Sequence, residues 1–227
     1  MDGIDMAHDY KIQVVKGSKV TVEGINIGEE YLDKESSTEQ LDVYKMPVMF
    51  EMEYDIVIDL PTGIKKEDSM YVMDEGRYKY KLSVSDLSDS DKSKFIEISK
   101  TNLQTLYNGV KDKKTFDEIK SSFEYEGGDL EILKEVYNRL VKAINANLTS
   151  IDFTDVNLMS ISLKSSGDME LYLKAKYNYT ISYEESGEVK THDSSDYDYL
   201  YLTYTYVNNE YKLVNATGLN TYFSKYY

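Results

Sequence analysis

The order of apolar and polar positions divides the chain into two parts. From residue 10 to 84, short stretches alternate apolar and polar residues, which is typical of half-buried strands. These stretches are Tyr10–Val15, Val20–Val22, Ile25–Ile27, Val43–Met46, Tyr54–Leu60 and Arg77–Val84. From residue 89 onward, helical spacing comes first and alternation follows. Helices followed by antiparallel strands favour an α+β fold, in which helices cover one face of a sheet.

Three amphipathic stretches predict the helices. Apolar residues recur at helical spacing over Phe95–Val110 and again over Leu130–Ile144. Between them, Thr115 and Glu118 have the spacing of a capping box, which predicts a short helix starting at Phe116. Gly127-Gly128 breaks the chain before Asp129, which is expected to cap the third helix.

Four strands are expected after the helices. Strict alternation over Leu171–Tyr183 is the strongest strand signal in the chain. The other three predicted strands are Ile151–Leu163, Tyr197–Val207 and Tyr211–Asn215. Turns are expected at Glu23-Gly24, Ser165–Asp168, Ser186-Gly187 and Asn208-Asn209. The segment Thr191–Asp196 is predicted to be a polar loop, and Pro47 is predicted to end the strand before it.

We expect two domains, a small β-rich domain over 1–84 and a helix-plus-sheet domain over 85–227. The junction is Ser85–Asp91, which is short, polar and rich in helix-capping residues. Short strands at regular spacing favour a small sandwich-like or barrel-like fold for the first domain.

Charge and composition exclude several functions. The net charge is -15, and both parts share the acidic excess, which argues against binding nucleic acid or anionic lipid. The chain has no cysteine, so disulfides, zinc-thiolate sites and cysteine nucleophiles are excluded. No apolar run reaches the length of a membrane span, and Met1–Met6 does not resemble a signal peptide. The chain is therefore either cytoplasmic or the soluble part of a protein whose anchor is missing.

Few residues offer catalytic or metal chemistry. His192 and Asp193 are neighbours in the predicted loop, and no nucleophile elbow accompanies them. Asp86, Asp89 and Asp91 could ligate calcium, but the full calcium-loop pattern is missing, and helix capping explains them better. We predict no catalytic residue, no cofactor and no metal.

Tyrosine is the most distinctive residue type, with 23 in the chain. Alternate tyrosines on adjacent strands would stack across a sheet. Buried, they would fill a core; exposed, they would form a rigid amphipathic platform for glycans or proteins. The residues selected as a candidate binding surface are Tyr199, Tyr201, Tyr204 and Tyr206.

Residues 89–227 resemble the nuclear-transport-factor-2-like family in the order of Phe95–Val110, Leu130–Leu148 and four strands ending at Tyr211–Val214. The resemblance implies a cystatin-like cone, in which a curled antiparallel sheet wraps a long helix. The small extra strands that the family has between its helices are not evident in this sequence.

Residues 10–84 resemble a module in exported parts of single-span Gram-positive membrane proteins related to the teicoplanin-resistance-associated proteins. The resemblance lies in Val15–Gly24 and Asp42–Phe50. It implies a zinc-ribbon-anchored protein, with these domains on the extracellular side of the membrane or in the cell envelope. The membrane would then be reached only through an anchor missing from this chain.

The leading functional hypothesis is non-enzymatic binding of a cell-wall component, a peptide or an envelope partner protein. One alternative is a small-molecule-binding or enzymatic cone pocket using tyrosine or aspartate in acid–base chemistry. Its inward candidates are Tyr107, Tyr177 and Tyr179, with no acid on that strand face. A structural spacer is the third possibility. An open cavity holding an acid favours the enzyme, and a filled cone with exposed tyrosines favours binding.

Overall fold

The computed structural model describes residues 5–38, 41–74, 76–144, 147–164 and 168–223. The protein is α+β, and sheet dominates: 51% of residues are in strands and 23% in helices. The strands are β1 (Met6–Val15), β2 (Lys19–Val22), β3 (Ile25–Ile27), β4 (Leu41–Phe50), β5 (Glu53–Asp59), β6 (Lys65–Tyr71), β7 (Arg77–Lys79), β8 (Asn147–Leu163), β9 (Met169–Glu185), β10 (Glu188–Val207) and β11 (Glu210–Thr217). The helices are α1 (Asp89–Lys111), α2 (Phe116–Ile119) and α3 (Glu131–Ala143), with 3-10 turns η1 (Glu29–Tyr31), η2 (Val84–Asp86) and η3 (Lys120–Ser122).

The chain divides into two compact units. The first contains residues 1–88 together with 162–168, and the second contains residues 89–161 and 169–227. The turn expected at Ser165–Asp168 lies outside the described residues except for its last member.

Two sheets build the first unit, in the orders β4-β1-β7 and β3-β2-β5-β6. All pairings are antiparallel except the short β1–β7 pairing, which is parallel. Alternate side chains of β1 (Tyr10, Ile12, Val14) and of β5 (Ile56, Ile58) are buried. The alternation in the sequence therefore identified the core-facing residues of both sheets.

The first unit differs from the sequence-based predictions at three strands. Pro47 does not end its strand: β4 continues to Phe50, because β4 is an edge strand where a missing amide donor is tolerated. Strand β6 was missed, since its sequence is polar and only Lys66 and Met70 are buried. The strand predicted over Arg77–Val84 is only three residues long and gives way to η2.

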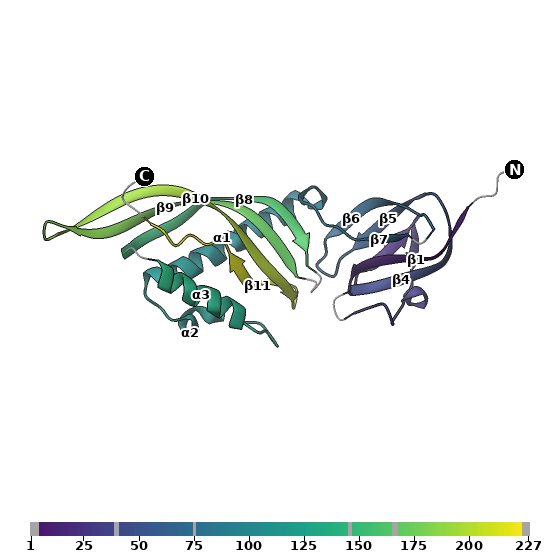
Figure 1. The fold of residues 1–227 in the computed structure, drawn as a ribbon, viewed down its shortest axis with the longest axis horizontal. Helices are drawn as coiled ribbons and strands as arrows, with labels where there is room; N and C mark the ends of the chain where they lie inside the picture. The colour runs from purple at the N-terminus through teal and green to yellow at the C-terminus, as the bar shows by residue number, and fades with distance from the viewer. Residues whose placement is uncertain (1–4, 39–40, 75, 145–146, 165–167, 224–227) are drawn as a thin grey trace. The chain divides into compact units, whose positions relative to one another are not determined.

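The second unit has one four-stranded antiparallel sheet in the order β11-β10-β9-β8 (Figure 1). The predicted turns at its hairpins are confirmed. Ser186 and Gly187 have φ of 55° and 82°, and Asn208 and Asn209 have φ of 52° and 63°. Positive φ at both central residues suits the right-handed twist of paired strands, and the Glu23-Gly24 turn of the first unit does the same.

Helix α1 packs along part of this sheet, and the β9–β10 hairpin extends beyond it (Figure 1). Phe95 packs on Tyr211 with ring centroids 4.8 Å apart, and Tyr107 packs on Phe153 at 5.5 Å. The Gln104 side chain donates to the Ile151 carbonyl at 2.7 Å and so ties the helix to β8. The apolar stripe read from the sequence is therefore the surface that contacts the sheet.

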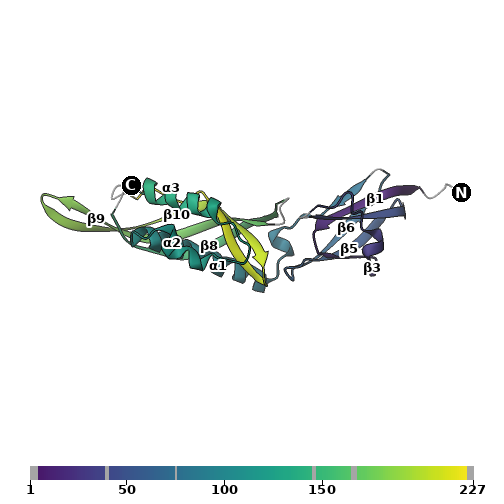
Figure 2. The same ribbon diagram turned by 90° about the horizontal axis from the view of Figure 1, so that it is seen from below.

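The two shorter helices follow the predicted capping. Glu118 Oε2 accepts hydrogen bonds from the amide and hydroxyl of Thr115 at 2.7 and 2.8 Å, which starts α2. Asp129 Oδ1 accepts from the Glu131 amide at 2.9 Å at the start of α3, although the N-cap position itself is Leu130 and not Asp129 as predicted. Helix α3 lies beside β11 in both views (Figure 1 and Figure 2).

Candidate functional site

An exposed row of tyrosines runs along β10 and β9 of the second unit. Tyr197, Tyr199 and Tyr201 occupy alternate positions of β10, so they share one face of the sheet. They are 49%, 46% and 44% exposed. Strand β9 contributes Tyr172, directly opposite Tyr201, and Lys174, directly opposite Tyr199. We call Tyr172, Tyr197, Tyr199 and Tyr201 the tyrosine ladder.

The rings of the ladder are ordered against one another. Tyr172 lies between Tyr201 and Tyr199, with centroid distances of 4.7 and 5.8 Å and interplanar angles of 26° and 23°. Tyr197 meets Tyr199 edge-on at 5.8 Å and 87°. Each such aromatic pair contributes about 0.5–1.5 kcal/mol beyond its buried area. The ladder is therefore held in one arrangement before any ligand arrives.

A lysine of β9 lies over the rings of the ladder. The Lys174 ammonium lies 4.2 Å from the centroid of the Tyr197 ring and 5.5 Å from that of Tyr199. Cation–π contacts of this kind contribute about 0.5–1 kcal/mol at exposed positions. Lys176, directly opposite Tyr197 on the same face, is a second cation, and it pairs with Asp155 at 3.8 Å.

Of the four tyrosines selected from the sequence, only Tyr199 and Tyr201 belong to this surface. Tyr204 is 1% exposed, and Tyr206 is half-buried with its ring 4.8 Å from that of Tyr211. The reason is parity: residues 204 and 206 differ from 199 and 201 by odd numbers, so they occupy the other face of β10. Tyr204 is thus corrected from a surface to an interior position, and Tyr206 to a half-buried position on the same face as Tyr204.

Tyr204 is a core residue with polar partners on α1. Its hydroxyl donates to Ser99 Oγ at 3.2 Å and accepts from Asn102 Nδ2 at 3.3 Å. Burial raises the pKa of its hydroxyl to about 12. Sequence reasoning missed Tyr172 and Lys174 as site residues because only the β9–β10 register brings them beside Tyr199 and Tyr201. It also left out Tyr197, which parity along β10 could have identified.

The inner face of the sheet carries the acid–base candidates. The Tyr177 hydroxyl donates to Asp198 Oδ2 at 2.9 Å and accepts from Asn220 Nδ2 at 2.8 Å. Asp198 comes from β10, opposite Ala175. The inward face of β9 carries no acid, as the sequence indicated, but the neighbouring strand β10 supplies Asp198.

Burial shifts the pKa of both groups of this pair. It raises the pKa of the Asp198 carboxyl above its ordinary value, against the hydrogen bond from Tyr177, which lowers it. Burial also raises the pKa of the Tyr177 hydroxyl, and the charge of Asp198 raises it further. The raised pKa of Asp198 is in the direction that a general acid needs, whereas the raised pKa of Tyr177 keeps its hydroxyl protonated at neutral pH.

Aromatic side chains fill the space around this pair. Phe223, 3% exposed, meets Tyr179 at 5.0 Å and Tyr177 at 6.3 Å between ring centroids. Phe153 meets Tyr177 at 5.5 Å, and the Tyr107 hydroxyl donates to the Asn220 carbonyl at 2.8 Å. Asn220 and Phe223 thus occupy the space beside the Tyr177–Asp198 pair.

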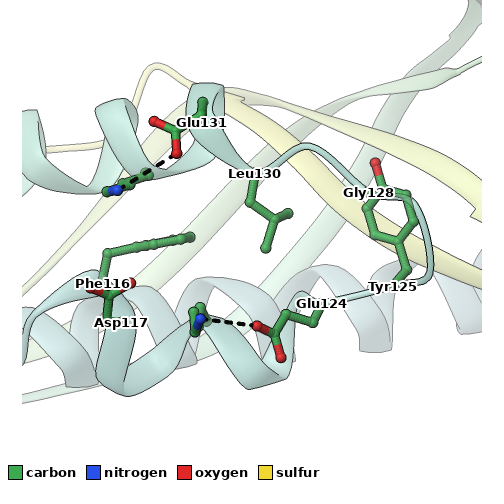
Figure 3. Close-up of a pocket in the computed structure, with 9 residues that line it drawn as sticks. Phe116, Asp117, Glu124, Tyr125, Gly128, Leu130 and Glu131 are labelled. Carbon is green, nitrogen blue, oxygen red and sulfur yellow. Dashed lines mark ion pairs between the residues drawn. The ribbon is translucent and has the colours of Figure 1, made fainter.

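A separate recess of about 630 Å³ lies between α2 and α3 (Figure 3). Phe116 and Leu130 are among its apolar lining residues. Its two lysines are already paired, Lys120 with Glu124 at 3.3 Å and Lys134 with Glu131 at 3.6 Å. These solvent-exposed pairs contribute little energy, and they leave neither lysine free to attract a ligand.

The remaining sequence candidates are structural. His192 lies within β10 and not in a loop, because β10 begins at Glu188. Asp86 Oδ2 accepts from the Ser83 amide at 2.7 Å as a cap, and Asp89 pairs with Lys92 at 3.5 Å. Within the described ranges, no group of three or more His, Cys, Asp or Glu side chains is placed to hold a metal ion. No helix in the part of the chain that the structure describes has the length and apolar character needed to cross a membrane.

Comparison with known proteins gives no relative from which a role for this site could be inferred. No protein-family profile, no curated protein and no solved structure matches the chain.

Proposed function

We propose that this chain is the extracytoplasmic, non-enzymatic part of an anchored Gram-positive envelope protein, and that the tyrosine ladder binds a partner protein or peptide. The placement outside the membrane rests on the resemblance carried by Val15–Gly24 and Asp42–Phe50. The absence of cysteine is compatible with that placement. The binding role rests on the second unit.

The exposed tyrosine ladder is the observation that carries the proposal. Three neighbouring tyrosines of β10 remain nearly half exposed on one face, although apolar surface is normally covered. A spacer has no need for such a face. The rings are already stacked, so a ligand would lose little side-chain entropy by using them.

Ring orientation favours a polypeptide over a glycan. The Tyr172 ring stacks on those of Tyr199 and Tyr201, and Lys174 lies over the Tyr197 ring, so ring faces of the ladder already have partners. A sugar would need open ring faces, whereas a polypeptide can use hydroxyls for hydrogen bonds and edges for packing. Tyrosine is also among the residue types that dominate binding energy at protein interfaces.

A fold resembling the nuclear-transport-factor-2-like cone accommodates this role. Helix α1 covers the inner face of the sheet and the ladder lies on the outer face. The helices α1 and α3 followed by β8–β11 support this fold, and no strand is described between α1 and β8. We propose the fold as the architecture that separates a filled interior from an exposed binding face.

A second candidate function is supported by the Tyr177–Asp198 pair. The raised pKa of Asp198 and its hydrogen bond from Tyr177 at 2.9 Å are features of a carboxyl that could act as a general acid. Phe223 and Asn220 occupy the space beside it, which argues for a structural role. Activity that appears only after removal of the C-terminal residues would favour this alternative over binding.

The test compares ladder variants with a matched control. Wild type, Tyr199→Ser/Tyr201→Ser and Tyr222→Ser are each used to select from a displayed peptide library and to bind purified Gram-positive cell-wall sacculi. Tyr222 is 58% exposed and lies outside the ladder, so it controls for the loss of a surface tyrosine. We expect wild type and Tyr222→Ser to enrich the same peptides and the ladder variant to lose them.

Two results would overturn the proposal. Equal peptide enrichment by the ladder variant would remove the ladder from binding. Ladder-dependent binding to sacculi without peptide enrichment would replace the partner protein with a wall polymer. Thermal unfolding of each variant verifies that binding, and not folding, has changed.

A further inference from the structure

A basic recess lies along the edge of the first unit, far in sequence from the tyrosine ladder. It has a volume of about 680 Å³ and is lined by residues of β6 and by the segment that begins with β7. Both strands are the last in their sheets, so each has a neighbour on one side only within the described residues. The recess is therefore bounded by two strand edges.

The charge of this recess opposes that of the whole protein. The basic side chains that line it are Lys66, Arg77, Lys79 and Lys81, and Asp68 is its carboxylate. Lys66 is 9% exposed and lies 3.3 Å from Asp68 and 3.4 Å from Asp86, so it already has anionic partners. In a chain of net charge -15, this leaves a local excess of positive charge.

Three cations of the recess are uncompensated. Arg77, Lys79 and Lys81 are exposed, and none has a carboxylate within ion-pair distance among the residues that the structure describes. Asp68 does not neutralise them, because it pairs with Lys66 and accepts a hydrogen bond from the Tyr78 hydroxyl at 2.8 Å. At physiological ionic strength the Debye length is about 8 Å, so distant acidic groups are largely screened and these near charges dominate.

The backbone of β7 offers a free edge at the same place. The Tyr80 amide donates to the Gln13 carbonyl of β1 at 3.0 Å. Backbone groups alternate in direction along a strand, so those of Arg77 and Lys79 face away from β1. By the same alternation, the Lys81 carbonyl also faces away from β1. It accepts a hydrogen bond from Lys66 Nζ, so this carbonyl is not available to an added strand.

The spacing of the three cations matches an extended chain. Arg77, Lys79 and Lys81 are two residues apart, which places neighbours about 7 Å from each other along a strand. Acidic side chains at alternate positions of an added strand have the same spacing and would lie opposite them. The intervening side chains would point to the face that Tyr78 occupies.

We propose that the free edge of β7 binds an extended acidic peptide segment by strand addition, with acidic side chains paired to Arg77, Lys79 and Lys81. Backbone hydrogen bonds to Arg77 and Lys79 supply affinity, and the alternating charges set the register. This site belongs to the first unit and is independent of the tyrosine ladder. The competing explanation is that the basic residues only keep an edge strand from self-association, and that explanation predicts no binding.

The test titrates the 227-residue chain with a short peptide in which glutamate alternates with valine. The comparison probes are the same peptide with N-methylated backbone, a peptide with its glutamates in one block, and inorganic polyphosphate. We expect saturable binding of the alternating peptide only. Hydrogen exchange of the Arg77 and Lys79 amides should slow by at least about tenfold in the complex.

Matched variants check the charges. The triple variant Arg77→Gln/Lys79→Gln/Lys81→Gln should weaken binding by about tenfold or more. The control triple Lys19→Gln/Lys34→Gln/Lys142→Gln loses the same charge from exposed lysines elsewhere and should bind as wild type does. If the first triple fails to fold, Lys79→Glu replaces it, with the amide exchange of wild type as the second readout.

Each other outcome rejects the proposal. No binding of the alternating peptide supports edge protection alone. Equal binding of the N-methylated peptide removes strand addition. Equal binding of polyphosphate identifies a general anion site. Equal loss of affinity in both triple variants shows that net charge, and not this edge, attracts the peptide.

Discussion

Tyr204 and Tyr201 provide a sharp test of how β10 is oriented. The two residues are three apart in one strand, yet Tyr204 is 1% exposed and Tyr201 is 44% exposed. Truncating a fully buried aromatic side chain costs about 3–5 kcal/mol, from lost transfer energy and the cavity left behind. We therefore expect Tyr204→Ala to destabilise the second unit by that amount.

Two further variants separate packing from hydrogen bonding. Tyr204→Phe keeps the ring but leaves the buried Asn102 amide and Ser99 hydroxyl without the tyrosine hydroxyl, which should cost about 1–3 kcal/mol. Tyr201→Ala loses its stacking on Tyr172, worth about 0.5–1.5 kcal/mol, with little other packing. The expected order of destabilisation is Tyr204→Ala, then Tyr204→Phe, then Tyr201→Ala.

The assay is urea unfolding followed by the helical circular dichroism signal. All three described α-helices belong to the second unit, so this signal reports that unit. With a urea dependence of about 2 kcal/mol/M, Tyr204→Ala should lower the midpoint by roughly 1.5–2.5 M. Equal midpoints for Tyr204→Ala and Tyr201→Ala would refute the assignment of these two residues to opposite faces.

Three other predictions concern buried groups. Burial raises the folded-state pKa of the Asp198 carboxyl. The protonated carboxyl therefore adds to the free energy of unfolding fully below the unfolded pKa of about 3.9, and this stabilisation is lost as pH rises through the folded-state pKa. Asp198→Asn should therefore be more stable than wild type at pH 7 and equal to it in acid; urea unfolding showing no gain at pH 7 would contradict this. Phe223→Ala should lower the free energy of unfolding by about 2–4 kcal/mol, since the ring is buried against Tyr177 and Tyr179. Limited proteolysis of this variant should then release the C-terminal residues. An uncut chain would argue against the contact. Lys66→Ala should destabilise the first unit by about 3–5 kcal/mol, because it leaves Asp68 and Asp86 without their cation. Faster hydrogen exchange of the β5 amides should reveal this loss of stability. Unchanged exchange would show that the ion pairs do not stabilise the unit.

Local signals in the sequence determined the elements of this protein. Alternation marked β9, helical spacing marked α1 and α3, and paired turn residues marked the hairpins, because each of these features depends on residues close in sequence. Parity along β10 is a local signal too, and by itself it separates Tyr199 and Tyr201 from Tyr204. Strand β6 gave no such signal, since its polar residues become ordered through pairing with β5.

The sites depended on the tertiary structure. The β9–β10 register brings Tyr172 and Lys174 beside the tyrosines of β10, and the same register places Asp198 within reach of Tyr177. The sheet order leaves β7 at an edge, where its alternating cations border a recess. Sequence determined the local conformation and which residues are apolar. Only the fold decided which residues meet, because register and sheet order are set by packing between segments that are far apart along the chain.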